Sequence, residues 1–148
     1  MSFFDVPGFY WNPVQYVSEY IDEWSAKGCS SEKDCEDSLY LFLHDRLPKL
    51  QIVKQYGRGR SHVDLLIQDK VMVELKYNLT STGEYQRLIG QLVDYKDWGK
   101  QFILVLVGEI EPNLFKQIQK ELERQFSVYS SFDETTRLIL KVVVEQTK

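Results

Sequence analysis

Three residues near the middle of the chain combine the charges that can act on a phosphate ester: Asp64, Glu74 and Lys76. Carboxylates offer the hard, anionic oxygens that Mg²⁺ and Mn²⁺ prefer as ligands. A lysine beside such an ion can position a bound water, lower the pKa of that water, or stabilise the negative charge that develops on phosphorus. Lys76 follows Glu74 by two positions, so both side chains would leave the same face of one strand. These residues therefore indicate metal-assisted hydrolysis.

The two carboxylates lie on neighbouring apolar segments, residues 63–67 and 71–77, with only Gln68-Asp69-Lys70 between them. Segments rich in Val, Ile and Leu that are joined by so short a link predict a β-hairpin. Its expected register places three pairs on an apolar face: Ile67 with Val71, Leu65 with Val73, and Val63 with Leu75. The other face would carry Leu66 with Met72, Asp64 with Glu74, and His62 with Lys76. Directly opposed carboxylates, about 5 Å apart at Cβ, repel each other. A divalent cation between them would reverse the sign of that interaction, so the hairpin is predicted to hold a metal.

Hydrophobic periodicity and capping signals predict the elements that position this hairpin. Helices are expected at about 13–27, 32–47, 82–98 and 112–126, and further strands at about 50–56, 101–107 and 138–144. Ser81 and Glu84 have the spacing of a capping box at the start of the third helix. A meander followed by strand–helix–strand crossovers predicts an α/β fold, with a mixed five-stranded sheet flanked by helices on both faces. Glu74 would lie on a central strand.

Composition limits the class of protein. The chain has 148 residues, 43% of them hydrophobic, which is enough for a single domain spanning 1–148. We expect residues 1–30 to form a helical extension and 31–148 the core. A membrane helix needs about 20 consecutive apolar residues, and the chain lacks such a segment and a signal-peptide pattern, so we expect a cytoplasmic protein with no membrane partner. Cys29 and Cys35 are interpreted as buried or free thiols, although a disulfide between them is an alternative.

A local basic stripe contrasts with the formal net charge of −4. Between positions 46 and 62 the chain has no acidic residue and carries five basic ones: Arg46, Lys49, Lys54, Arg58 and Arg60. The stripe leads directly to Asp64, which favours a loop that contacts phosphate. A solvated face with a flexible Gly-Arg-Gly-Arg turn is the alternative.

The helix that bears Glu36, the hairpin with Asp64 and Glu74-Leu75-Lys76, and the later Gln91-Leu92-Val93-Asp94-Tyr95 resemble the PD-(D/E)xK nuclease superfamily. This superfamily includes restriction endonucleases, Holliday-junction resolvases and RecB-like nucleases. The resemblance extends from about residue 32 to the end and implies a restriction endonuclease-like core. One departure is Val63, which stands where the motif has proline.

The resemblance implies a role for each matching position. Asp64, Glu74, the Leu75 carbonyl and Glu36 would bind Mg²⁺ or Mn²⁺, and Lys76 would be catalytic. Gln91 and Tyr95 would hold Lys76 or a substrate phosphate. The implied activity is hydrolysis of DNA by a metal-activated water.

Structural alternatives remain for several of these residues. Lys76 could form a plain salt bridge with Asp64 or Glu74. Glu36 lies on the same helical stripe as Leu39 and Leu43, where an unpaired carboxylate is costly. A first-turn acidic residue favoured by the helix dipole is the other interpretation of Glu36, and Glu32 is the fallback ligand. Gln91 and Tyr95 are also consistent with amphipathic packing.

Nucleic-acid contacts are expected from Lys54, Arg58, Arg60, His62 and Tyr95, with DNA as the partner and a homodimer as an option. Two rival functions remain. One is a catalytically idle nucleic-acid-binding module. The other is a protein-interaction subunit, suggested by the acidic charge and an aromatic N-terminal segment that could instead close the core: Phe3, Phe4, Phe9, Tyr10 and Trp11.

Overall fold

The computed structural model describes residues 6–59, 61–126 and 138–143. Its helices are α1 (Pro7–Trp11), α2 (Pro13–Ile21), α3 (Glu32–Arg46), α4 (Thr82–Lys96) and α5 (Pro112–Phe126). Its strands are β1 (Ile52–Arg58), β2 (Ser61–Ile67), β3 (Val71–Leu79), β4 (Gln101–Ile110) and β5 (Leu138–Val143). The predicted order of elements is therefore confirmed, with a short additional helix, α1, at the start.

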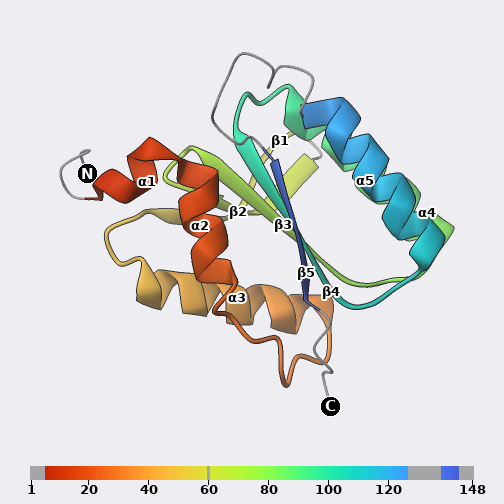
Figure 1. Cartoon of the computed structure of the whole chain (residues 1–148), viewed down its shortest axis with the longest axis horizontal. Coiled ribbons are helices and arrows are strands. Elements are labelled where there is room, and N and C mark those ends of the chain that lie inside the picture. The colour runs from red at the N-terminus through yellow and green to blue at the C-terminus, as the bar shows by residue number, and fades with distance from the viewer. Residues whose placement is uncertain (1–5, 60, 127–137, 144–148) are drawn as a thin grey trace.

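The strands form one mixed sheet in the order β1-β2-β3-β4-β5. The pairs β1–β2 and β2–β3 are antiparallel, whereas β3–β4 and β4–β5 are parallel. Helices α1, α2 and α3 lie on one side of the sheet, and α4 and α5 lie on the other (Figure 1). The α/β class and the helices on both faces are confirmed, and Glu74 lies on the middle strand, β3.

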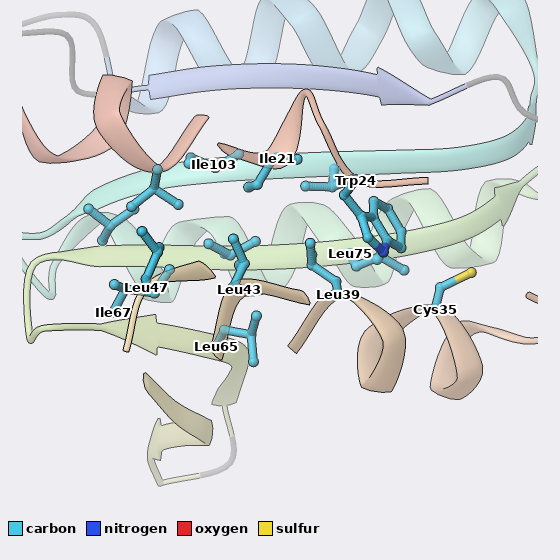
Figure 2. Close-up of a cluster of buried hydrophobic side chains, with 14 of the residues drawn as sticks. Ile21, Trp24, Cys35, Leu39, Leu43, Leu47, Leu65, Ile67, Leu75 and Ile103 are labelled. Carbon is cyan, nitrogen blue, oxygen red and sulfur yellow. The ribbon is translucent and has the colours of Figure 1, made fainter. Parts of the chain in front are cut away.

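Each face of the sheet has its own hydrophobic core. The first core packs α2 and α3 against the sheet through residues that include Ile21, Leu39, Leu43, Leu65 and Leu75 (Figure 2). The second packs α4 and α5 through residues that include Leu88, Leu92, Tyr95, Met72 and Leu104. Strand β4 contributes alternate side chains to both cores, which explains its nearly continuous apolar sequence.

Helix ends follow the chemistry of their caps. The Ser31 hydroxyl accepts the Asp34 N–H at the start of α3, and the Ser81 hydroxyl accepts the Glu84 N–H at the start of α4. The Ser81 hydroxyl also donates to the Glu84 carboxylate at 3.0 Å, so the two side chains of the predicted capping box are in contact. These caps mark where the two helices beside the acidic hairpin begin.

The first helical segment differs from its prediction. We expected one helix over 13–27, but α2 ends at Ile21 and the chain continues through turns. Trp24 is still buried, and its indole N–H donates to the Ser38 hydroxyl of α3 at 3.1 Å. Tertiary contact with α3, rather than helical periodicity, therefore buries this side chain. Phe9 is fully buried whereas Trp11 is 74% exposed; Phe3 and Phe4 lie outside the described residues.

The hairpin follows its predicted register only near the turn. Three pairs are confirmed: Ile67 with Val71, Leu66 with Met72, and Leu65 with Val73. Gln68 and Asp69 have φ of 50° and 58°, as a tight turn requires. No further β2–β3 pair forms in the described sheet beyond Leu65 and Val73. The predicted direct pairing of Asp64 with Glu74, and of His62 with Lys76, is therefore wrong.

The side chain of Val63 also lies on a different face of the sheet from the one predicted. We expected it to share a face with Leu65, but Val63 belongs to the second core and Leu65 to the first. Residues two apart on a regular strand share a face, so β2 changes its orientation at Asp64. Strand β1 changes at the same level, because Lys54 is paired with Leu65 and Tyr56 with Val63 while Gln55 between them has φ of 53°. Both β1 and β2 therefore change their side-chain orientation at the level of Asp64.

Candidate active site

Asp64 and Glu74 interlock β2 with β3 where the backbone ladder stops. The Asp64 N–H donates to Glu74 Oε1 at 3.0 Å, and the Leu75 N–H donates to Asp64 Oδ2 at 2.8 Å. Carboxylate oxygens thus accept N–H groups that would otherwise pair with strand carbonyls. The two carboxyl groups lie close enough that each contributes to the pKa of the other. Although the register was predicted wrongly, the two predicted ligands lie together.

Two residues after Leu75, the edge of β3 donates a hydrogen bond to another carboxylate. The Tyr77 N–H donates to Glu32 Oε1 at 3.2 Å, and Glu32 begins α3. Within a strand, the N–H and C=O of one residue point toward the same neighbouring strand. The Leu75 carbonyl therefore faces the β2 side, where Asp64 lies. Its side chain, by contrast, is buried in the first core.

Glu36 reaches this acidic pair through Gln55. Glu36 is only 6% exposed, and its Oε1 accepts the Gln55 side-chain amide N–H at 2.7 Å. The same amide nitrogen donates to Asp64 Oδ1 at 3.3 Å. Helix α3 and strands β1 and β2 are thereby connected by one amide group. The predicted burial of Glu36 is confirmed, and its partner is an uncharged side chain.

Gln55 was not identified from the sequence. Its position on an alternating, partly exposed strand carries no chemical signal. What marks it in the structure is φ of 53°, an uncommon conformation for a residue other than glycine, asparagine or aspartate. Such outliers persist where surrounding contacts hold them. Here the amide bridge between Glu36 and Asp64 is that contact.

Lys76 and Tyr95 complete the surroundings of Glu74. Lys76 Nζ lies 3.6 Å from Glu74 Oε2, which confirms the salt-bridge alternative and leaves a catalytic role untested. The Tyr95 hydroxyl lies 3.2 Å from the same oxygen and donates to the His62 carbonyl at 2.7 Å. Glu74 itself is 1% exposed. A carboxyl group this deep requires such partners, because burial disfavours its charge.

The electrostatics of the pair favour bound protons. Burial raises the pKa of Asp64 to about 6, and the negative charge of Glu36 adds to this shift, while the Leu75 N–H and Lys76 oppose it. Burial also raises the pKa of Glu74 well above its usual value, with a further contribution from Asp64. Burial raises the pKa of Tyr95 too, so its hydroxyl remains a donor. A cation that binds this pair must compete with protons.

The donor set fits a small, hard divalent ion. Within the described ranges, no three His, Cys, Asp or Glu side chains form a group that could hold a metal ion by themselves. Mg²⁺, however, commonly uses one or two carboxylates and completes its octahedron with water and substrate phosphate. Asp64 and Glu74 supply those two carboxylates, and each oxygen keeps lone-pair capacity beyond its hydrogen bond.

Gln91 lies on α4 one turn before Tyr95. Its Oε1 is buried and has no hydrogen-bond partner among the residues that the structure describes. A buried amide oxygen without a donor is costly. This oxygen is therefore available to a donor such as an ammonium group. The predicted pair Gln91 and Tyr95 thus shares one helix face, with Tyr95 in direct contact with Glu74.

The structure describes the side chains of only some of the residues that were predicted to contact nucleic acid. Lys54 pairs with Asp37 of α3, with Nζ 2.9 Å from Oδ1. His62 is exposed on β2. Arg60 and the side chain of Arg58 lie outside the described residues. The basic stripe therefore does not converge on the carboxylates as a single unit. Lys54 pairs with Asp37 of α3, whereas Arg46, the last residue of α3, lies 3.8 Å from Glu23.

No family model matches the chain, and no curated protein matches its sequence. Among solved structures, SfsA of Pyrococcus furiosus in complex with Ca²⁺ is similar with a TM-score of 0.44 and 16% sequence identity. The match covers 72% of this chain and 55% of that one, so the chain spans little more than half the length of SfsA. In the described part of the chain, no helix is long and apolar enough to cross a membrane.

Proposed function

We propose that this chain is a metal-dependent nuclease that hydrolyses phosphodiester bonds in DNA, on a restriction endonuclease-like core. The observation that carries the proposal is the interlocked pair of Asp64 and Glu74, with Lys76 3.6 Å from the Glu74 carboxylate. A buried like-charge pair is unfavourable in an ordinary sheet. It is typical of sites where a charge is needed for chemistry.

Asp64 and Glu74 would hold Mg²⁺ or Mn²⁺, with the Leu75 carbonyl and Glu36 as further oxygen donors. When bound, the ion would supply Lewis-acid activation of water and neutralise charge on the phosphate. Lys76 would stabilise negative charge on phosphorus with its ammonium group. Tyr95 keeps the Glu74 carboxylate in place by hydrogen bonding, and Gln55 does the same for Glu36 and Asp64. Gln91 would position Lys76 or a substrate phosphate.

The proposal is tested by incubating the full chain with labelled duplex, single-stranded and branched DNA and with RNA, in Mg²⁺, in Mn²⁺ and in chelator. We expect cleavage of DNA only when an ion is present. Asp64→Asn, Glu74→Gln and Lys76→Met should each reduce the cleavage rate by about 100-fold or more. Circular dichroism should show that the variants remain folded.

Matched controls are available on exposed positions of the same types. Glu109→Gln on β4 and Lys120→Met on α5 change charge away from the pair, so both should cleave like the parent protein. Cleavage that survives Glu74→Gln, or a chain that cleaves no substrate with either ion, contradicts the proposal. Binding without cleavage would instead support an idle nucleic-acid-binding module.

A further inference from the structure

One outer face of α3 carries a row of charged and aromatic side chains, here called the α3 strip. Its members are Lys33, Asp37, Tyr40 and His44 of α3, with Lys54 from β1. The helical members are spaced four, three and four residues apart, so they lie on one face of the helix. Each of the five is exposed or half-buried. The strip therefore faces solvent along most of α3.

Two lysines in the strip are held by a single carboxylate. Lys33 Nζ lies 3.0 Å and Lys54 Nζ 2.9 Å from the same oxygen, Asp37 Oδ1. These hydrogen bonds from Lys54 and Lys33 lower the pKa of Asp37, so its carboxylate stays ionised. One negative charge thus fixes two positive charges side by side, and the group keeps a net positive charge on an acidic protein. Phosphate groups are a natural ligand for such a pair.

Two aromatic rings continue the strip beyond the lysines. Lys54 Nζ lies 4.9 Å from the centroid of the Tyr40 ring. The Tyr40 and His44 rings follow, with centroids 5.7 Å apart and planes tilted by 34°. His44 is exposed. Cations beside aromatic rings are the arrangement on which single-stranded nucleic acids bind, with charges on the backbone and rings under the bases.

The strip begins beside the candidate active site. Lys33 lies three residues before Glu36 on the same helix, and Gln55 bonds both Glu36 and Asp64. The pKa of Lys33 is raised, first by its hydrogen bond to Asp37 and further by the charges of Glu36 and Asp64. From Glu36 to His44 the helix rises about 12 Å at 1.5 Å per residue, which is the span of a few stacked nucleotides.

We infer that the α3 strip binds a single-stranded polynucleotide and leads it to the acidic pair. Lys33 and Lys54 would contact consecutive phosphates, and His44, supported by Tyr40, would stack on a base. A duplex is not expected to bind there, because its bases are paired and their faces covered. This inference rests on the proposed function for the chemistry at the end of the strip, but the binding itself requires neither metal nor cleavage.

The test measures binding of the full chain to fluorescent single-stranded DNA, single-stranded RNA and duplex DNA by anisotropy, in chelator and over a series of salt concentrations. We expect the single strands to bind more tightly than the duplex, and the DNA and RNA arms show which sugar is preferred. Lys33→Ala and Lys54→Ala should each reduce the slope of log K against log salt by about 0.7. His44→Ala should weaken binding by about tenfold with the slope unchanged.

Controls use similar side chains outside the strip. Lys120→Ala on α5 and Trp11→Ala on α1 remove an exposed cation and an exposed ring, and both should bind like the parent chain. Circular dichroism confirms that each variant is folded. If the parent chain does not bind single strands, or if the strip variants bind them as the parent does, the inference is wrong.

The two proposals fail separately. Strip-dependent binding of single strands without cleavage of any substrate keeps this inference and contradicts the nuclease. Metal-dependent cleavage by a chain whose strip variants bind and cleave single strands normally keeps the nuclease and contradicts this inference.

Discussion

The Asp64 backbone N–H donates to the Glu74 carboxylate at 3.0 Å, across the point where β2 and β3 cease to pair. The Leu75 N–H, next to Glu74, bonds the Asp64 carboxylate in return. Each acidic side chain therefore holds the other's strand. This arrangement explains how the fold tolerates two carboxyl groups in contact, and it separates the shape of the site from its charge. Replacing Asp64 or Glu74 by its isosteric amide should therefore keep the shape of the site and remove the negative charge.

Asp64→Asn should stabilise the protein in chelator at pH 8. The pKa of Asp64 is raised by burial from 3.8 to about 6, so between these values the folded state binds more protons than the unfolded state. The contribution of this group to stability is therefore full below about pH 4 and lost as the pH rises through about 6. Asparagine never ionises, and we expect a gain of roughly 1–3 kcal/mol at pH 8 that shrinks toward zero at pH 4. Urea unfolding at pH 4, 6 and 8 measures this difference, with the exposed Asp97→Asn as control. A gain that is independent of pH would contradict the assignment.

Mn²⁺ should raise the melting temperature of the parent chain at pH 8 and have a smaller effect at pH 5. A ligand that binds only the folded state stabilises it, and protons compete for the same carboxylates at low pH. Thermal melts over a Mn²⁺ series at both pH values test this expectation. Asp64→Asn and Glu74→Gln should lose the shift, whereas Glu109→Gln should keep it. An equal shift in all four proteins would place the ion elsewhere.

Tyr95→Phe should destabilise the fold by about 1–3 kcal/mol, because the hydroxyl of the buried Tyr95 donates to the His62 carbonyl at 2.7 Å and lies 3.2 Å from Glu74 Oε2. The ring stacks on Phe102 with centroids 5.7 Å apart, and phenylalanine preserves that contact. Loss of a donor to the carboxylate also raises the pKa of Glu74 further. The Mn²⁺-dependent melting shift should then require a higher pH. Tyr85→Phe on the same helix is the control, and unchanged stability and pH dependence in Tyr95→Phe would count against this role.

Two substitutions of Gln55 should separate the cost of its backbone conformation from the contribution of its side-chain hydrogen bonds. Gln55→Ala and Gln55→Gly both remove the amide that joins Glu36 to Asp64, but only glycine adopts φ of 53° without strain. We expect the glycine variant to be more stable than the alanine variant by about 1 kcal/mol in urea unfolding. Both should weaken the effect of Mn²⁺, because Glu36 and Asp64 are no longer held together. Equal stability of the two variants would show that the backbone conformation costs little.

Local signals predicted most of the elements. The helix predicted over 112–126 has the bounds of α5 in the structure, and the capping-box spacing of Ser81 and Glu84 predicted the start of α4. Such signals act within one helical turn, so neighbouring residues are sufficient to recognise them. The turn of the hairpin was predictable for the same reason, because a three-residue link leaves few ways to pair the adjacent strands.

The sequence by itself determined which chemistry the chain carries: two carboxylates and a lysine on adjacent strands, with a glutamate on a preceding helix. Only the tertiary structure decided how they meet. The reversal of faces at Asp64, the left-handed conformation of Gln55 and the contact of Tyr95 with Glu74 all depend on strands and helices far apart in the chain. Predicting strand register from alternating hydrophobic residues assumes a regular ladder of backbone hydrogen bonds. Side-chain oxygens that replace backbone acceptors break this ladder, and the alternation of residues in the sequence does not show it.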